Sequence, residues 1–194
     1  MRARFLTVCF ALLAVPVAAQ EVPRVEVQTS YGFARVFPGG GAPSFSLNGW
    51  NASLSLNPQP WLGLVADFSG GYAWPTFNLS GFVSSFRVKN RHHSYLFGPR
   101  YYYRKPERFT PFAHLLVGVV NSRAEIQSSQ GSISGSDTTF SLAIGGGFDV
   151  KASRRIAIRV LQADYVLTRF GGQVQHNPRL SFGVVFRLGP LKPR

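Results

Sequence analysis

This sequence lacks two common means of stabilising a fold or crossing a membrane. It contains one cysteine, Cys9, which lies near the N-terminus. If that N-terminal segment is removed, the rest of the chain can form no disulfide and offers no thiol nucleophile. Beyond the same segment, no apolar run approaches the roughly 18 residues of a membrane-spanning helix. Any insertion into a membrane would therefore have to use β-strands.

The first residues have the pattern of a secretory signal peptide. A short basic start precedes an apolar run over residues 5–15, and small residues occupy the −3 and −1 positions of a cut after Ala19. The run is roughly ten residues long, which is too short to span a bilayer. We therefore predict that residues 1–19 are a signal peptide and that residues 20–194 form one domain.

Acidic residues are scarce. The chain has 21 Lys and Arg residues against 8 Asp and Glu residues, a formal net charge of +13 at pH 7. Such an excess could indicate nucleic acid, but a secreted chain rarely meets it, and the basic residues are spread over the whole sequence. Anionic lipid headgroups and lipopolysaccharide fit the excess better, and we expect no nucleic acid partner.

The dominant pattern in the rest of the chain is an alternation with a period of two residues. In the segment Arg179–Leu188, apolar side chains take every second place, and polar, small or charged residues take most of the others. Successive side chains of a strand point to opposite faces, so this segment has one apolar and one more polar face. A soluble sheet would bury the apolar row, but the other row is too large and too charged to be explained by a solvated outer face alone. This favours the inverse arrangement, with the apolar side outward, which is that of a transmembrane β-barrel.

Eight segments share this alternation, and the connections between them are alternately long and short. Short turns are typical of the periplasmic end and long loops of the outer end, which places both termini in the periplasm. The predicted fold is all-β, an eight-stranded antiparallel up-and-down transmembrane β-barrel. The predicted strands cover residues 25–36, 47–56, 61–72, 92–104, 110–121, 138–151, 155–168 and 179–188, with loops over 37–45, 74–91, 123–136 and 171–178.

Two of these segments contain an irregularity. Pro99 cannot donate a ladder hydrogen bond, so we predict a β-bulge there. In the segment 155–168, Gln162 and Asp164 have the opposite parity to Arg159. One extra residue near Leu161 would turn these polar side chains to the same face, so we predict a second β-bulge at that point.

The inward row predicts an ionic network. The interior of an eight-stranded barrel is only wide enough for its own side chains. Each unpaired buried charge would cost several kcal/mol, so the inward charges must pair or hold water. We expect a plugged lumen rather than an open pore. The predicted network comprises Glu26, Asp67, Arg100, Arg104, His114, Asp149, Arg159, Asp164, Arg179 and Arg187.

Two groups of residues suggest contact with the membrane interface. Arg87, Lys89 and Arg91 alternate along a strand-like segment and are candidates for contact with the phosphates of lipopolysaccharide, with a solvated loop as the alternative. Aromatic rings also lie mostly toward the strand ends, where they can sit at headgroup level. They are Tyr31, Trp50, Trp61, Tyr72, Trp74, Tyr95, Tyr101, Tyr103 and Tyr165.

The closing strand LSFGVVFRL and the segments YLFGPRYYY, PFAHLLVGV, LAIGGGFDV and ADYVLTRFGG carry a family resemblance. Together with the signal peptide and the eight strands, they resemble the small outer-membrane β-barrel family of OmpA and OmpX type. The resemblance implies a monomer in the outer membrane of a Gram-negative bacterium, in contact with outer-membrane lipids, lipopolysaccharide and the barrel-assembly machinery. Such chains commonly finish on an aromatic residue, whereas residues 189–194 add a polar tail here. We expect no peptidoglycan-binding domain.

His92, His93 and Ser94 form the one sequence constellation that suggests catalysis. An outer-membrane lipid A deacylase of similar size uses histidine, serine and a carboxylate, and His92 and Ser94 have same-face spacing. No acidic residue is nearby in sequence to orient the histidine. We therefore expect no catalytic, cofactor or metal site and a structural or surface-interaction role. The alternatives are a lipid A-modifying enzyme, a narrow pore and a soluble lipocalin-like barrel.

Overall fold

The computed structural model describes residues 22–37, 44–73, 76–78, 85–106, 108–128, 131–170 and 172–189. These residues include no helix long and apolar enough to cross a membrane. The predicted signal peptide over residues 1–19, the tail over residues 190–194 and the side chains of Trp74 and Arg87 lie outside the described residues.

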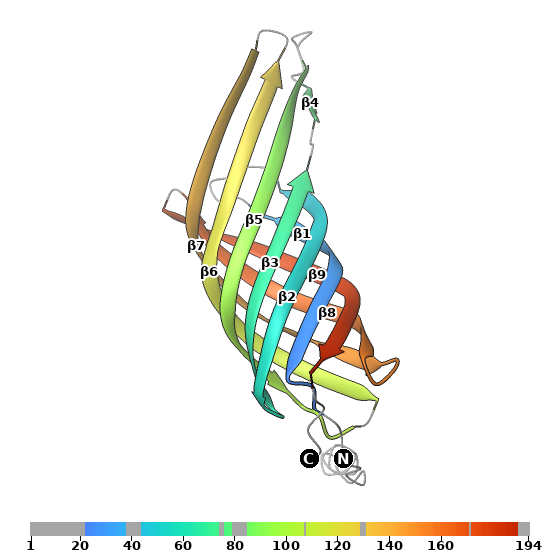
Figure 1. Cartoon of the computed structure of the whole chain (residues 1–194). Coiled ribbons are helices and arrows are strands. Elements are labelled where there is room, and N and C mark those ends of the chain that lie inside the picture. The colour runs from blue at the N-terminus through green and yellow to red at the C-terminus, as the bar shows by residue number, and fades with distance from the viewer. Residues whose placement is uncertain are drawn as a thin grey trace, which may run out of the picture.

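All strands belong to one sheet that closes on itself (Figure 1). β1 pairs with β9 at one seam, β3 pairs with β5, and every pairing is antiparallel. β4 also pairs with β5, in line with β3, so it prolongs one barrel position. The predicted eight-stranded antiparallel barrel is therefore confirmed. The strands are β1 (Val25–Val36), β2 (Phe45–Gln59), β3 (Leu62–Ala73), β4 (Thr76–Asn78), β5 (Ser85–Tyr102), β6 (Phe109–Ser128), β7 (Gly131–Lys151), β8 (Ile156–Phe170) and β9 (Gln173–Leu188).

The apolar face of the sheet points outward. In β9, Phe182 is 59% exposed, whereas the next residue toward the N-terminus, Ser181, is 1% exposed. In β5, Leu96 is fully buried and Phe97 is 52% exposed. A soluble barrel would bury its large apolar side chains, whereas a lipid-facing wall exposes them. Other exposed members of this wall are Leu54, Leu64, Leu115, Val117, Phe140, Ile144, Ile158 and Val160.

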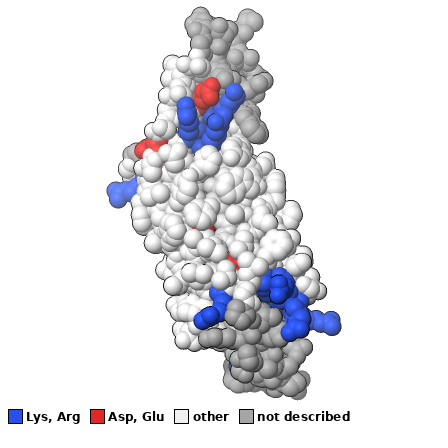
Figure 2. Space-filling view, viewed as in Figure 1, with Lys and Arg blue, Asp and Glu red and all other residues white. Residues whose placement is uncertain are grey.

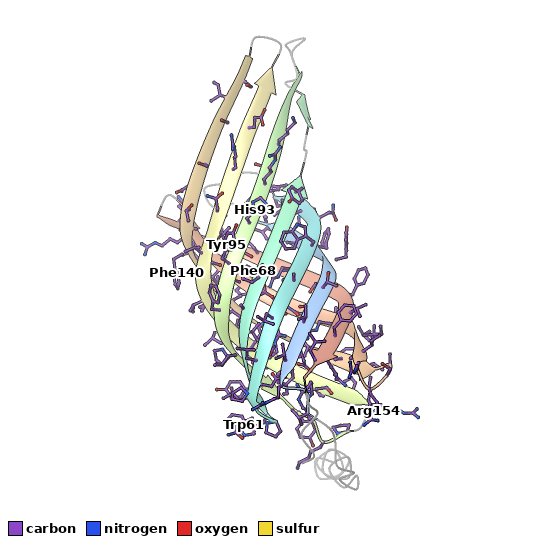
Figure 3. The ribbon with its side chains drawn as sticks, viewed as in Figure 1. Trp61, Phe68, His93, Tyr95, Phe140 and Arg154 are labelled. Atoms are coloured by element: carbon purple, nitrogen blue, oxygen red, sulfur yellow. The ribbon has the colours of Figure 1, made fainter. Side chains whose placement is uncertain are left out.

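Exposed aromatic rings mark both ends of this apolar wall. At one end Trp61 stacks on Tyr101, with ring centroids 6.0 Å apart and an interplanar angle of 12°. Toward the other end, Tyr31 pairs with Trp50 across β1 and β2, and Tyr95 is exposed on β5. Figure 3 shows Trp61 and Tyr95 at these two levels. Such rings suit the two membrane interfaces.

Three neighbouring strands rise above the rest of the barrel. β5, β6 and β7 have 18, 20 and 21 residues, whereas roughly ten residues suffice to cross a bilayer. Their excess lies at the end opposite the one where β1 begins and β9 ends (Figure 1). We call this part the raised sheet, comprising residues 85–91 of β5, 123–128 of β6 and 131–138 of β7.

The raised sheet corrects two of the loop predictions, and β9 corrects a third. Much of 74–91 and 123–136 is strand, and β9 already begins at Gln173 rather than at Arg179. In the raised sheet, the outward positions of β5 and β6 carry charge instead of apolar side chains, and the first residues of β9 are mostly polar. The apolar-outward alternation of the membrane-spanning strands is therefore missing from these segments. Backbone pairing does not need that alternation outside the lipid, because both faces of the sheet can meet water.

The raised part of β7 has one free edge. β8 pairs with β7 only from Ser141 to Lys151. Among the described residues, no strand pairs with the edge of Gly131–Phe140 that faces away from β6. Ile133 on this segment is 78% exposed.

The β-bulge predicted near Leu161 is confirmed. Phe148 of β7 pairs with Leu161, but the next residue, Asp149, pairs with Arg159, so one residue of β8 has no partner on β7. The register of β8 with β9 shifts at the same place, between Arg159 and Gln162. As a result both Arg159 and Gln162 are buried inside the barrel.

The β-bulge predicted at Pro99 is wrong. β5 keeps one register with β3 throughout, and its register with β6 is the same on both sides of Pro99. The proline only leaves a gap in the pairing with β6, at Gly98 and Pro99. A Cβ at Gly98 would lie 2.1 Å from the carbonyl oxygen of Leu115, so glycine is needed for the close approach of the two strands at this gap.

Candidate functional site

The barrel lumen contains the predicted ionic residues. All ten side chains lie inside, and the most exposed of them, Arg179, has only 7% of its surface accessible. They come from β1, β3, β5, β6, β7, β8 and β9, except Arg104, which follows β5. Five arginines thus face four carboxylates in one enclosed space.

One cluster lies at the end of the lumen where β1 begins. Arg104 donates from Nη2 to both carboxylate oxygens of Glu26, each 3.2 Å away, and from Nε to the carbonyl oxygen of Pro60 at 3.0 Å. Arg187 lies on the other side of Glu26, with Nε 3.6 Å from Oε1. Glu26 is therefore held between two cations.

A second cluster is built on Arg159. Its Nε and Nη2 donate to the two oxygens of Asp149 at 2.8 and 3.1 Å, and its Nη1 donates to Gln162 at 2.8 Å. This two-point pairing is the strongest geometry for a guanidinium and a carboxylate. The guanidinium carbons of Arg159 and Arg100 lie 4.2 and 4.8 Å from the ring centroid of Phe112, which adds cation–π attraction.

A third cluster is centred on Asp164. Arg179 donates to Oδ2 of Asp164 from Nη2 at 2.7 Å and from Nε at 2.9 Å, and Gln162 donates to the same oxygen at 2.8 Å. Arg179 also reaches across the lumen to Asp67 at 3.2 Å and to Ser69 at 3.0 Å. The cluster therefore joins β9, β8 and β3 through side chains.

His114 connects this cluster to Arg100. Nε of Arg100 lies 3.3 Å from Nδ1 of His114, and Nε2 of His114 lies 2.9 Å from Oδ1 of Asp164. An arginine can only donate, so Nδ1 accepts and Nε2 carries the hydrogen given to Asp164. Gly145 pairs with Asp164 across β7 and β8, and a Cβ there would lie 2.2 Å from Oδ1. Glycine leaves the space that this carboxylate needs.

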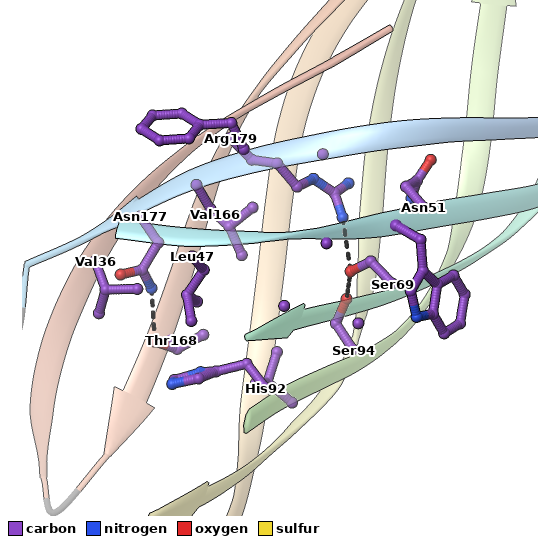
Figure 4. A pocket seen from close by; sticks show the side chains of 18 residues that line it. Val36, Leu47, Asn51, Ser69, His92, Ser94, Val166, Thr168, Asn177 and Arg179 are labelled. Atoms are coloured by element: carbon purple, nitrogen blue, oxygen red, sulfur yellow. Dashed lines mark hydrogen bonds between the residues drawn. The ribbon is translucent and has the colours of Figure 1, made fainter. Parts of the chain in front are cut away.

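A small cavity lies in the lumen beside Arg179, which is one of its lining residues (Figure 4). Its volume is about 80 Å³, which is room for a few water molecules rather than for a typical ligand. Val36, Leu47 and Val166 form apolar walls, and Asn177 donates to Thr168 at 3.1 Å on one side.

The structure places His92 and Ser94 around the same small cavity but gives them different hydrogen-bond partners. Ser94 shares a 2.5 Å hydrogen bond with Ser69, whereas Nε2 of His92 lies 3.4 Å from the hydroxyl of Ser122. His93 is on the outer face beside Tyr72. Among the described contacts, His92 has neither Ser94 nor a carboxylate as a hydrogen-bond partner. The described residues also contain no group of three or more His, Cys, Asp or Glu side chains that could hold a metal.

The basic residues of the raised sheet form a second candidate site. Odd-numbered residues of β5 and β6 face outward, as the exposure of Tyr95, Phe97, Val117 and Val119 shows. By the same parity Lys89 and Arg91 lie on the outer wall of β5.

The pairing of β5 with β6 adds to this candidate site a basic residue that the sequence analysis did not identify. Arg123 of β6 lies directly opposite Arg91 and is exposed, and Glu125 lies opposite Lys89. Arg123 was missed because its segment was predicted to be a loop, although its spacing from Val119 already gave it the outward parity. Figure 2 shows basic and acidic side chains at the upper end and basic side chains at the lower end, with a broad, mostly uncharged belt between them.

Comparisons with known proteins agree with this geometry. A model of the outer membrane protein β-barrel domain family matches residues 5–187. A search of curated proteins found no match.

Solved structures of small outer-membrane proteins share the fold. The attachment invasion locus protein Ail of Yersinia pestis is 19% identical, with a TM-score of 0.59 over 85% of this chain and 99% of that chain. Neisserial surface protein A is 15% identical, with a TM-score of 0.55 over 84% and 97% of the two chains.

Removing one partner of the two-point pair in the lumen should be costly. In Asp149→Ala, Arg159 keeps its charge in a buried site without its carboxylate, and we expect a loss of about 3–5 kcal/mol in the free energy of unfolding. Urea unfolding of the purified protein in lipid vesicles, followed by tryptophan fluorescence, measures this loss. The exposed Asp137→Ala is the control and should change stability by less than about 0.5 kcal/mol. Equal stabilities of the two variants would contradict the pairing.

Proposed function

The chain belongs to the family of outer membrane proteins with a β-barrel domain, and from this premise we propose that its role is structural and surface-interactive, without a dedicated enzymatic activity. It contacts the outer leaflet through lipopolysaccharide and displays the raised sheet above it. The observation that carries the proposal is the basic row of Lys89, Arg91 and Arg123 on the outer wall of the raised sheet.

The position of this row suits the phosphates of lipopolysaccharide. Arg91 lies four residues beyond Tyr95 on the same face of β5, which is about 13 Å along a strand. Tyr95 belongs to the exposed aromatic rings at the outer edge of the apolar wall. Side chains at Arg91 and Arg123 therefore extend at the level where headgroup phosphates begin, beyond the hydrocarbon. Guanidinium groups bind phosphate oxygens in a bidentate manner.

Neutralising the basic row should weaken the binding of lipopolysaccharide. For Lys89→Gln/Arg91→Gln/Arg123→Gln we expect an affinity at least about tenfold lower, since each cation near an anionic surface contributes on the order of 1 kcal/mol. Titration of the purified protein with fluorescent lipopolysaccharide measures the dissociation constant. The charge-preserving variant Lys89→Arg/Arg91→Lys/Arg123→Lys is the matched control and should stay close to the wild type. If both variants bind equally well, the row is not the site.

The filled lumen supports a plugged barrel over the alternative of a narrow pore. Arg179 spans the interior from Asp164 to Asp67, and Arg159 and Arg100 flank Phe112 below it. The small cavity beside Arg179 has room for only a few water molecules.

We expect no large, steady single-channel conductance from the purified protein in planar lipid bilayers. The interior of an eight-stranded barrel is filled by its own side chains, and the three ionic clusters lie within it. We therefore expect no continuous water path wide enough for hydrated ions. Arg179→Ala removes the side chain that crosses the lumen and is the informative comparison, since any leak should be larger in that variant. A large stable conductance of the wild type would establish the pore instead.

The lipid A-modifying enzyme remains the alternative from a different class. It would use Ser94 as the nucleophile, activated by a histidine. The hydroxyl of Ser94 is engaged by Ser69, and Nη1 of Arg179 donates to that same Ser69. This arrangement favours a structural role for Ser94.

Lipid A should therefore be the same with and without Ser94. We expect identical lipid A mass spectra from a Gram-negative host that carries the empty vector, the wild-type protein or Ser94→Ala. Immunoblotting of outer-membrane fractions checks that both proteins are present. A mass shift caused by the wild type and abolished by Ser94→Ala would support the enzyme.

A further inference from the structure

A second set of exposed basic side chains lies at the opposite end of the barrel. This is the end where β1 begins, β9 ends and short turns join β5 to β6 and β7 to β8, and in outer-membrane barrels such turns face the periplasm. Figure 2 shows basic side chains gathered at the lower edge of the uncharged belt. We call them the periplasmic basic arc, and its members are Arg24, Lys105, Arg108, Lys151, Arg154 and Arg155.

Backbone hydrogen bonds hold neighbouring members of the arc side by side. The amide of Lys151 donates to the carbonyl of Arg108 at 2.8 Å, which joins the ends of β6 and β7. The hydroxyl of Ser153 accepts from the amides of Arg155 and Ile156 at 3.3 and 3.1 Å and orders the turn between β7 and β8. The cations therefore project from fixed, adjacent strand ends.

The arc begins where the lipid-facing wall ends. Phe109 and Ile156, exposed apolar residues, directly follow Arg108 and Arg155 in the chain. Nζ of Lys105 lies 5.8 Å from the ring centroid of Tyr103, which is exposed at the same end. Lysine and arginine at such positions keep their stems along the apolar surface and their charges at headgroup level.

Apart from Arg154, the members of the arc have no acidic side-chain partner among the described ion pairs. The carboxylates nearest this end, Glu26 and Asp149, are buried and bound to arginines of the lumen. No exposed residue that the structure describes at this end is acidic. The sequence adds one acid, Glu107, which lies outside the described residues. A concentrated positive charge beside an apolar wall favours the binding of an anion that also carries an apolar part.

We propose that the periplasmic basic arc binds anionic phospholipid headgroups of the inner leaflet, of the phosphatidylglycerol or cardiolipin class. The charges sit at the margin of the hydrocarbon, so a phosphate can reach them while its acyl chains lie along the exposed apolar residues. Peptidoglycan also carries anionic groups, but it offers no apolar part for that wall. The site lies in the opposite leaflet from the lipopolysaccharide contact and does not depend on it.

Tryptophan quenching by brominated lipids tests this inference at one end of the barrel. Trp61 is exposed beside Tyr101 at the periplasmic end, so Trp50→Phe/Trp74→Phe leaves a reporter only there. The protein is reconstituted into phosphatidylcholine vesicles that contain either brominated phosphatidylglycerol or brominated phosphatidylcholine. At low salt we expect brominated phosphatidylglycerol to quench Trp61 about five times as strongly as brominated phosphatidylcholine. At 0.5 M NaCl this ratio should fall toward one.

Two variants in the same background locate the effect. Lys105→Gln/Arg108→Gln/Lys151→Gln should remove the preference, whereas Lys89→Gln/Arg91→Gln/Arg123→Gln, at the other end, should leave it unchanged. Heat-modifiable migration on a gel checks that each variant is folded. Equal quenching by the two lipids in the wild-type background at low salt would overturn the proposal whatever the variants do. Salt-sensitive co-sedimentation with purified peptidoglycan, combined with equal quenching, would assign the arc to the cell wall instead.

Discussion

Closure of the backbone hydrogen-bond ladder is the constraint on which this structure depends. A sheet in hydrocarbon can leave no edge unpaired, because lipid offers no partner for backbone amides and carbonyls. β1 and β9 meet this requirement by pairing from Val25 to Ala34 without a register shift. Once the sheet is closed with eight positions, the faces are assigned: the apolar row meets lipid and the polar row fills a narrow interior.

The narrow interior then determines the electrostatics of the lumen. Each carboxylate contacts at least one arginine, and Arg179 joins strands that are more than a hundred residues apart in the sequence, since Ser69 and Arg179 differ by 110 positions. Such pairs do not by themselves make a protein more stable than an apolar core would, because desolvation offsets the attraction. Their geometry does favour one register, since a shifted strand would leave buried charges without partners. Small glycines such as Gly145 are part of the same arrangement.

The sequence predicted most of what lies within the membrane and less of what lies outside it. Alternation identified the eight strands and the inward parity of every charged residue of the lumen, and the parity change in β8 located the bulge at Leu161. The raised sheet was missed because its outward positions carry charged residues such as Arg91 instead of apolar ones, and Arg123 was missed with it. Pro99 was misjudged because a proline in a long, otherwise paired strand costs one local gap in the ladder rather than a change of register. The pairing of each arginine with a particular carboxylate could not be predicted from parity, because it depends on the register of the strands around the barrel.

The free edge of β7 has a consequence of its own. Over Gly131–Phe140 this edge has no strand partner among the described residues, and Asp137 is its one charged residue. Charges, prolines and bulges are the usual devices that keep a strand edge from pairing with other chains. An edge with so few of them presents main-chain donors and acceptors, which an extended polypeptide can meet whatever its side chains are. Among the described residues, this edge is therefore open to backbone pairing with an extended chain of almost any sequence.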